Sequence, residues 1–489
     1  MKKLKQVLAL TLSLIMLLTA CGGGNAASEN NETQQPQKET AEAPATSSDS
    51  TGEKTKITIW HHELVSYRID AWQYVIDKFN AANPDVEVVQ EAILWADAMP
   101  KLLSSSQANV MPEINQAADA QWSTTYVTGL LLPVDDVVEE IDAKEHFYPD
   151  SLKSYTLDGH TWGVPISSVT IQITYRPSIL KELGYEKFPE TWSEFEEFLE
   201  KATLDEDGDG VPERYGIGLP ASRCTEHNDN FLAWLATMDN GIFDEQGNVA
   251  FNNEDTIRTA EFLGGLMKKY SPPNILSMDA GEMLMNFTAG KVACMAFLFP
   301  DLVSAFKEGD RDIATAPLPR PDDVPEEDYR ALVTTHALNI TKAAEDPVKY
   351  EACKRFIQFC LEPENIWVLT CGQEPGFFSP PTETGYDLIE QGWFNQEMFP
   401  LEGFDFSEGS SDIKMFQDIE SNVAGINFEN GFGPGNRFGP VNLAATEING
   451  AFVIADMMHK IVGEDMPVEE AVAWAQSRME EISDEVNGN

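Results

Sequence analysis

Basic residues are scarce in this sequence, which has 33 lysines and arginines against 81 aspartates and glutamates in 489 residues. The resulting formal charge of −48 repels phosphate backbones and anionic lipid surfaces, so it excludes nucleic acid as a natural partner. Most of these acidic side chains are expected on a solvated surface. Because they are so numerous, no pair of carboxylates can be assigned as a catalytic dyad from the sequence alone.

The sequence also lacks an apolar run long enough to span a bilayer, which takes about 20 residues. The run from Val7 to Leu18 follows three lysines and ends shortly before Cys21. This pattern is typical of a cleaved signal peptide, and it resembles the signal of bacterial lipoproteins. The resemblance implies that residues 1–20 are removed and that Cys21 carries the lipid on the extracellular face of the cell membrane. The alternative is an ordinary secretory signal with an incidental cysteine.

Aromatic and branched aliphatic residues are absent from residues 25–54. Such a segment cannot bury enough apolar surface to offset its ordering entropy, so residues 21–54 are predicted to be a disordered, lipidated tether. A coil of this length spans roughly 30 Å. Loss of the three signal lysines leaves 30 basic residues against 81 acidic ones, a net charge of −51 on the exported chain.

Cysteines are few and odd in number beyond Cys21. They are Cys224, Cys294, Cys353, Cys360 and Cys371. At least one thiol is therefore free unless two chains are joined by a disulfide. A disulfide between Cys360 and Cys371 is one alternative that the sequence leaves undecided. The spacing matches no zinc site.

Catalytic motifs are missing as well. Neither H-E-x-x-H nor G-x-S-x-G occurs, and the consecutive residues His61, His62 and Glu63 form a poor zinc site because adjacent side chains on a strand point to opposite faces. The sequence therefore predicts a protein that is not an enzyme. The alternatives are an exported glycan-active enzyme and a surface sensor or adhesin.

The core begins with an alternating strand at residues 56–60, followed by an amphipathic helix that ends near Phe79 and a second strand at 86–89. Strand, helix and strand in this order predict a βαβ unit with a right-handed crossover. Ligands in such sheets bind beyond the carboxyl ends of the strands, which is where His62 and Glu63 lie. About 435 residues follow the tether, which favours two domains.

Three later helices have clear start signals. Thr191 and Glu194 have the spacing of a capping box, Asp346 precedes a proline at the first helical position, and another helix begins near Pro467. Their apolar stripes are typical of core-facing helices.

Several segments in order resemble the extracellular solute-binding proteins of ABC transporters, in particular the carbohydrate-binding family that includes maltose-binding protein. They are 57–61 (ITIWH), 79–88, 111–114 (MPEI), 129–135 (GLLLPVD), 157–165 (LDGHTWGVP), 188–195 (FPETWSEF), 287–293 (FTAGKVA) and 316–319 (APLP). Residues 115–118 carry no aromatic where sugar binders often have one.

The resemblance implies an α/β, two-lobed periplasmic-binding-protein-like fold of type II with a hinge between the lobes. The first lobe would take residues 55–168 and 318–362, and the second lobe 169–317 and 363–489. A monomer of this kind captures a carbohydrate, here an oligosaccharide, between its lobes and delivers it to the permease subunits of an ABC transporter.

Sugar sites combine aromatic platforms with carboxylates and amides, because sugars present C–H faces and a rim of hydroxyls. By position relative to the family segments, the expected substrate-binding residues are His62, Glu63, Asp119, Gln121, Trp122, Trp234, Phe299, Asp301, Glu374, Phe377 and Arg437. For the tryptophans and Phe299 the alternative is a place in the core. For Arg437 it is a surface charge.

Residues 205–213 (DEDGDGVPE) follow the first nine positions of an EF-hand loop. The expected oxygen ligands for a structural calcium are Asp205, Asp207, Asp209, the backbone carbonyl of Val211, and Glu213. Gly216 stands at the twelfth position and cannot supply the usual bidentate carboxylate. The alternative is a metal-free acidic turn.

Overall fold

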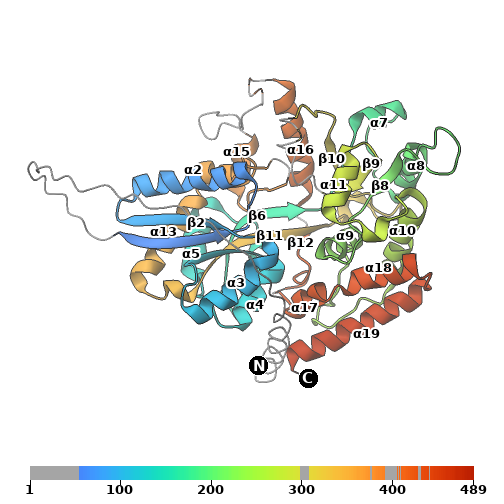
Figure 1. The fold of residues 1–489 in the computed structure, drawn as a ribbon. Helices are drawn as coiled ribbons and strands as arrows, with labels where there is room; N and C mark the ends of the chain where they lie inside the picture. Colours follow the sequence, from blue (N-terminus) through green and yellow to red (C-terminus); the bar gives the residue numbers. More distant parts are fainter. Residues whose placement is uncertain are drawn as a thin grey trace, which may run out of the picture.

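The chain forms two α/β lobes that lie side by side (Figure 1). The computed structural model describes residues 54–297, 305, 308–374, 377–390, 405, 407, 409–427, 431–439 and 441–488. The predicted lipidation residue Cys21, the predicted signal peptide and nearly all of the predicted tether lie outside the described residues, as do Phe299 and Asp301. The two-lobed fold predicted from the resemblance is confirmed.

The first lobe is built on a sheet with the strand order β12-β11-β3-β1-β2, in which β6 also pairs with β11. Its strands are β1 (Thr55–His61), β2 (Val86–Ala92), β3 (Ile114–Ala118), β6 (Val164–Thr170), β11 (Ala331–Ile340) and β12 (Gly431–Phe432). Strand β1 pairs in parallel with β2 and β3, and α2 (Ser66–Ala82) is the crossover with Trp72 and Phe79 buried. The predicted βαβ unit is therefore confirmed, and its apolar helix face covers the sheet.

The second lobe is built on a smaller sheet with the order β10-β7-β9-β8. Its strands are β7 (Ile173–Tyr175), β8 (Tyr215–Gly218), β9 (Val292–Ala296) and β10 (Ala314–Ala316). Strands β8 and β9 run in parallel, whereas β7 is antiparallel to both β9 and β10. A separate short hairpin consists of β4 (Thr156–Leu157) and β5 (His160–Thr161). The only carboxyl ends of parallel strands described in this lobe are thus those of β8 and β9.

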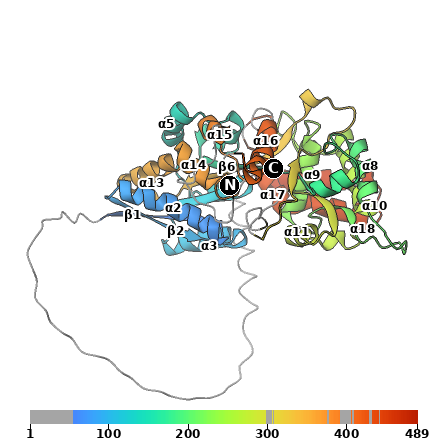
Figure 2. The same cartoon turned by 90° about the horizontal axis from the view of Figure 1, so that it is seen from above.

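Helices cover both sheets (Figures 1 and 2). Besides α2, the first lobe carries α3 (Trp95–Ala108), α4 (Asp119–Val127), α5 (Asp135–Glu145), α6 (Pro149–Lys153), α13 (Pro347–Cys360), α14 (Pro363–Leu369) and α15 (Glu383–Glu390). The second lobe carries α7 (Pro177–Glu182), α8 (Trp192–Ala202), α9 (Thr225–Ala236), α10 (Glu254–Tyr270), α11 (Ala280–Thr288), α17 (Ala444–Gly450), α18 (Val453–Gly463) and α19 (Val468–Asn487). Helix α16 (Ser411–Asn427) contacts β10 of one sheet and β11 of the other. Short 3₁₀ turns lie at Ile275–Ser277, Glu326–Asp328 and Lys342–Ala344.

Two of the predicted helix starts are confirmed, and the third differs in its bonding. The Asp346 carboxylate accepts hydrogen bonds from the first turn of α13, and α19 begins directly after Pro467. Helix α8 begins after Thr191, but its capping box does not form. The Glu194 carboxylate accepts from the backbone N–H of Glu190 at 3.1 Å, and the Thr191 side chain makes no capping bond.

The predicted lobe boundaries need correction in more than one place. Helix α14 packs against α2 and β6, and α15 packs against α5, so residues 363–390 lie with the first lobe and not with the second. These helices bury Ile366 and Trp367 against first-lobe elements, which is the physical reason for their placement. Residue 320 pairs with Thr191, which places the start of the segment 318–330 with the second lobe.

The five cysteines beyond Cys21, all of them described, form no disulfide with one another, and all but Cys224 are buried. The open alternative of a bridge between Cys360 and Cys371 is therefore not realised. In the described part of the chain, helices long and apolar enough to span a bilayer are absent.

Candidate ligand-binding site

Both lobes bring the carboxyl ends of parallel strands toward their common junction. In the first lobe these are the ends of β1, β2 and β3, and in the second lobe the ends of β8 and β9 with α9 beyond them. Helix α9 contacts β11, and α17 contacts α4. Figures 1 and 2 show α9 and α17 on the side of the second lobe that faces the first.

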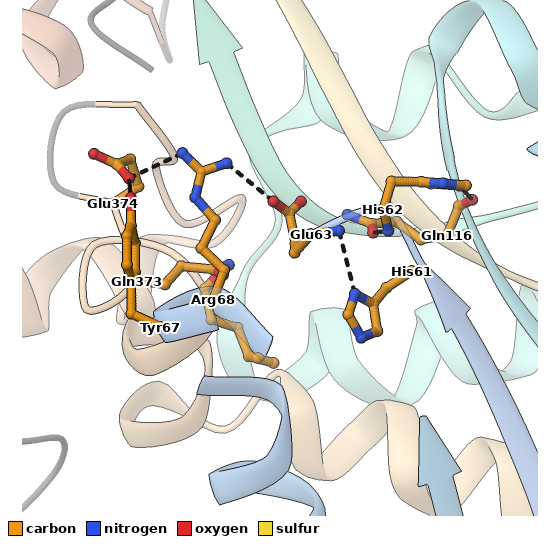
Figure 3. A network of polar contacts seen from close by, with 9 residues as sticks. His61, His62, Glu63, Tyr67, Arg68, Gln116, Gln373 and Glu374 are labelled. Atoms are coloured by element: carbon orange, nitrogen blue, oxygen red, sulfur yellow. Dashed lines mark hydrogen bonds and ion pairs between the residues drawn. The ribbon is translucent and has the colours of Figure 1, made fainter. Parts of the chain in front are cut away.

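A buried ionic group lies at the first-lobe edge, and we call it the Arg68 cluster: Glu63, Tyr67, Arg68 and Glu374 (Figure 3). The Arg68 guanidinium donates to Glu63 Oε2 at 3.1 Å and to Glu374 Oε2 at 2.9 Å, and the Tyr67 hydroxyl also donates to Glu374. Glu63 is 3% exposed and Glu374 is 0% exposed. Burial lowers the pKa of Arg68, but the charges of Glu374 and Glu63 outweigh it and raise the pKa above its ordinary value. The two carboxylates therefore share one positive charge inside the protein.

His61 holds Glu63 in place from the strand side. The backbone N–H of Glu63 donates to His61 Nδ1 at 3.2 Å, so Nε2 carries the proton that is donated to Gln90 Oε1 at 2.7 Å. Burial lowers the pKa of His61 to about 4, against the opposing effect of the Gln90 bond and with a further lowering from His62. His61 is thus a neutral positioning group.

His62 links the ends of the three parallel strands. Its ring nitrogens lie 2.9 Å from the carbonyl oxygens of Ile93 and Gln116, and its backbone N–H donates to the Gln116 side chain at 3.0 Å. The side chain is buried, and burial lowers its pKa. These backbone contacts hold the ring against the strand ends, and its contact with substrate stays a prediction.

Apolar side chains form the exposed rim of this edge. Leu64 and Val65 follow β1 and are 46% and 36% exposed, and Leu94 follows β2 and is 51% exposed. Phe377 is partly exposed, with its ring centroid 5.4 Å from the Arg68 guanidinium carbon. Sequence reasoning named Phe377 but missed the aliphatic rim, although its position directly after strand ends was the available signal.

The structure places both predicted tryptophans in the core. Trp122 is 0% exposed, with its ring centroid 5.6 Å from that of Tyr155, and Trp234 is 0% exposed, with its ring centroid 5.5 Å from that of Phe262. Neither ring has a free face for a sugar, so the core alternative is the correct one for both.

The remaining predicted residues have different outcomes. Glu63 and Glu374 are paired with Arg68 in the Arg68 cluster, and their contact with a substrate stays a prediction. Asp119 and Gln121 open α4 at the junction, and their side chains lie outside what the structure describes. The Arg437 guanidinium bonds to Asp239 at 3.1 Å and lines a pocket of about 210 Å³ beside residues 241–247.

The second-lobe edge carries polar side chains that sequence reasoning missed. Asp229 on α9 accepts a hydrogen bond from the Asn449 amide of α17 at 3.1 Å. Burial and the nearby Glu226 raise the pKa of Asp229 to about 7, against the opposing effect of the Asn449 bond. The available signal was the polar run of residues 225–230 at the start of an otherwise apolar helix.

The lobes also touch directly next to this edge. The hydroxyl of Ser123 on α4 lies 2.6 Å from that of Thr446 on α17. Nearby, the amide of Asn436, four residues after β12, donates to Ser154 Oγ at 2.7 Å. A cavity of about 20 Å³, room for about one water, is lined by Ser154 and by residues that include Asn449.

A larger hollow of about 510 Å³ lies between α16 and the edge strand β10. It is lined by Tyr175, Arg311 and Asp412, among others. Strand β7 separates this hollow's strand β10 from β9 in the sheet. The Arg311 and Asp412 side chains that line the hollow bond to each other at 2.9 Å. We therefore place the candidate site at the junction and not here.

The acidic loop of the second lobe has the donors for a hard cation. The carboxylates of Asp205, Asp207 and Asp209 each offer an oxygen within 4.8 Å of the others, and all three residues are exposed. The Glu213 carboxylate accepts from the backbone N–H of Glu206 at 2.7 Å, so it lies close to the same loop. Oxygens about 2.3–2.6 Å from one ion can be this far apart, so this donor set fits calcium.

Two lobes whose parallel strands end at a common junction are typical of the two-lobed binding proteins of the extracellular solute-binding class. The chain matches the family model described as bacterial extracellular solute-binding protein over residues 74–367, and it belongs to this family.

Among curated proteins, the chain is similar to the maltotriose-binding protein of Pyrococcus abyssi, with 24% identity over 266 residues, or 54% of this chain and 53% of that protein. It is 23% identical to the arabinooligosaccharide-binding protein of Bacillus subtilis over 229 residues, or 44% of this chain and 48% of that protein. The matched part therefore spans about half the length of these relatives.

Solved structures share the fold over most of the chain. A maltose-bound MalE3 of T. maritima superposes with a TM-score of 0.67 at 18% identity, covering 88% of this chain and 100% of that chain. A cyclic alpha-maltosyl-1,6-maltose binding protein from Arthrobacter globiformis gives a TM-score of 0.67 at 16% identity, with coverages of 88% and 100%.

Proposed function

We propose that this protein is a membrane-anchored extracellular lipoprotein that captures a carbohydrate, an oligosaccharide, between its lobes and delivers it to an ABC transporter permease. The observation that carries the proposal is the two-lobed fold of this family, whose relatives include maltotriose-binding and arabinooligosaccharide-binding proteins. The junction adds the two kinds of group that a sugar needs: Phe377 and the aliphatic rim for C–H faces, and Asp229 with Asn449 for hydroxyls.

Thermal-shift screening of the mature chain against neutral oligosaccharides tests sugar capture. An oligosaccharide at 100 times its Kd should add about 2.7 kcal/mol to the free energy of unfolding. Phe377→Ala should weaken binding by about 1–3 kcal/mol if the ring packs on a sugar. Phe438→Ala is the matched control, because Phe438 is 46% exposed and packs on Arg437 instead. A panel without any shift would contradict the proposal.

The bound glycan should remain chemically unchanged. Mass spectrometry after long incubation distinguishes capture from turnover, and a product would favour the alternative of an exported glycan-active enzyme. If the glycan is bound intact but the permease is not stimulated, the sensor or adhesin alternative gains support.

The lipid anchor is proposed from Cys21 and the preceding signal. Cys21→Ser should release the protein into the medium or leave it unprocessed, because the tether has no other membrane affinity. Cell fractionation with an antibody to the mature chain measures this. Retention of a signal-cleaved Cys21→Ser protein in the membrane fraction contradicts the anchor.

Calcium in the loop 205–213 is proposed as a structural ion. Asp205→Asn with Asp207→Asn should lower the melting temperature only when calcium is present, since an ion bound to the native state alone stabilises by mass action. The control pair Asp484→Asn with Glu485→Gln removes the same charge from exposed positions on α19. Equal melting of the unmutated protein in calcium and in chelator removes the metal from the proposal.

A further inference from the structure

Two paired strands at the boundary between the lobes leave few side chains within reach of solvent. Strand β6 ends at Thr170, and β7 of the second-lobe sheet begins soon afterwards at Ile173. Strand β11 pairs with β6 and is the first strand after β10 of the second-lobe sheet. Within β6 only Val169 is partly exposed, and within β11 only Thr334 and His336 are. Figure 1 shows β6 and β11 where the two lobes meet.

These partly exposed side chains lie on one face of the sheet. In the antiparallel register Thr334 is opposite Val169 and His336 is opposite Ser167, and residues directly opposite each other share a face. Thr334 and His336 also share a face, because alternate residues of one strand point to the same side. We call Val169 and Thr334 the floor pair.

The floor pair lies beyond the carboxyl end of β3. The register between β3 and β11 ends where Ala118 is opposite His336, and Thr334 lies nearer the start of β11. At about 3.4 Å per residue, Thr334 is about 7 Å past the end of β3. Ligands of α/β sheets bind beyond such strand ends. Helix α9 of the second lobe also contacts β11, so the floor pair belongs to the junction.

The face of the floor pair continues into the candidate site of the first lobe. The His336 ring centroid lies 5.8 Å from that of Phe378, and the Phe378 ring centroid lies 5.3 Å from the Arg68 guanidinium carbon. The ring centroid of Phe377, the proposed platform for a sugar, lies 4.7 Å from that of Phe378. A chain of contacts therefore connects the floor pair's face with Phe377 and the Arg68 cluster.

The floor pair has groups that suit an uncharged sugar ring. The methyl groups of Val169 are apolar, as are the C–H faces of sugars. The Thr334 hydroxyl can donate one hydrogen bond and accept others, and the structure gives it no partner among the described residues. Both side chains come from strands held together by a regular register, so they are in place before a ligand binds. Such pre-organisation limits the entropy lost on binding.

We propose that the floor pair fixes the position of one ring of a captured neutral oligosaccharide. The Thr334 hydroxyl exchanges a hydrogen bond with a hydroxyl of this ring, and the Val169 methyl groups pack on its C–H face. This inference rests on the proposed sugar-binding function and adds to it a contact from the strands at the boundary between the lobes. Thr334 and Val169 are thus specificity-determining residues of the junction.

The hydroxyl is tested by isothermal titration with neutral oligosaccharides that include maltotriose and arabinotriose. Thr334→Val keeps the shape of the side chain but removes its hydroxyl, so binding should weaken by about fivefold, the scale of one neutral hydrogen bond. Thr334→Ser retains the hydroxyl and should bind nearly as tightly as the unmutated protein. Thr58→Val is the matched control, because Thr58 is also partly exposed in a strand of this sheet but lies before the carboxyl end of β1. Its affinity should be unchanged.

The apolar contact is tested in the same titrations. Val169→Ala removes two methyl groups from the floor pair and should weaken binding by about tenfold, the scale of burying two such groups. Val348→Ala is the control, because Val348 is 63% exposed on α13, and it should bind as the unmutated protein does. Melting temperatures of all variants show which of them are folded.

The outcomes separate this inference from the proposed function. If the unmutated protein binds none of the sugars, the sugar-binding function fails and the inference fails with it. If it binds a sugar and Thr334→Val binds that sugar equally well, only the inference is overturned. Equal losses of affinity in Thr334→Val and Thr334→Ser also overturn it, because the hydroxyl is then not the cause. Should Thr334→Val not fold, an unchanged affinity of Val169→Ala overturns the inference in its place.

Discussion

The Arg68 cluster of the first lobe and Asp229 of the second lobe place carboxyl groups at equivalent edges of two sheets. The two sites differ in the groups that stabilise the charge of these carboxylates. In the first lobe one guanidinium serves two carboxylates and a tyrosine adds a further bond. In the second lobe a single neutral amide faces the carboxyl. The buried carboxylates of the Arg68 cluster share a cation, whereas the partly exposed Asp229 has no cation within ion-pair distance among the described residues.

The physical basis of the difference is desolvation. Taking a carboxylate out of water costs several kcal/mol unless an opposite charge and hydrogen bonds compensate it. Arginine suits this role because its planar group stays charged and offers donors in two directions. Asp229 lacks such a partner among the described residues, and its pKa rises instead.

The largest expected effect comes from removing the shared cation. Arg68→Met leaves two buried carboxylates unpaired and should lower the free energy of unfolding by about 3–5 kcal/mol in urea denaturation. Arg355→Met is the control, because Arg355 pairs with Asp85, which is 66% exposed, and should cost at most about 1 kcal/mol. Similar losses of unfolding free energy in the two variants would contradict the expected difference between a buried ion pair and an exposed one.

The next largest expected effect is the contribution of His61 to the pH dependence of the free energy of unfolding. His61 is neutral in the folded protein with its pKa lowered to about 4, so the unfolded chain takes up a proton first as the pH falls. Stability from this site should be complete above about pH 6.5 and lost toward pH 4, on the order of 3 kcal/mol in all. Urea unfolding of His61→Gln against the unmutated protein at pH 7 and pH 4 measures it. If both proteins lose the same free energy of unfolding between pH 7 and pH 4, His61 is not the cause of that loss.

A smaller loss is expected when the charge of one carboxylate is removed without its hydrogen-bonding atoms. Glu374→Gln retains an oxygen for Tyr67 and Arg68 but loses the ion pair, so it should cost about 1–3 kcal/mol, less than Arg68→Met. Denaturant midpoints of the two variants give the ranking directly. A larger loss for Glu374→Gln would mean that Glu374, and not Arg68, organises the cluster.

The last effect has the opposite sign, and the partial exposure of Asp229 to solvent keeps it small. The raised pKa of Asp229 means that the folded protein keeps a proton which the unfolded chain loses above about pH 4, so this site weakens folding as the pH rises to about 7. Asp229→Asn should therefore melt slightly above the unmutated protein at pH 8 and equally at pH 4. A lower melting temperature of the variant at pH 8 would contradict this expectation, because it would mean that the ionised Asp229 carboxylate stabilises the fold.

Local sequence patterns predicted the local elements well. The alternation at 56–60 and the helix face with Trp72 and Phe79 identified the first βαβ unit, and Asp346 marked the start of α13. The order of family segments predicted the two-lobed fold. Each of these signals lies within a short stretch of chain, where periodicity and capping have a direct physical meaning.

The site was predicted less well, because its contacts join distant residues. Trp122 and Trp234 were candidates by type and position, and no local pattern distinguishes a buried ring from a cleft ring. Glu374 lies 306 residues after Arg68 in the chain, so their ion pair could not be inferred from spacing.

The sequence by itself determined the class of the molecule: an acidic two-lobed chain behind a signal-like segment, with Glu63 at the end of its first strand. Only the tertiary structure decided which carboxyls are compensated. Compensation depends on side chains brought within about 3 Å from separate elements, such as Arg68 of α2 beside Glu374, and on the absence of any such cation at Asp229 among the described residues. Electrostatic energy varies steeply over these distances, and distance in space is what the order of residues alone does not specify.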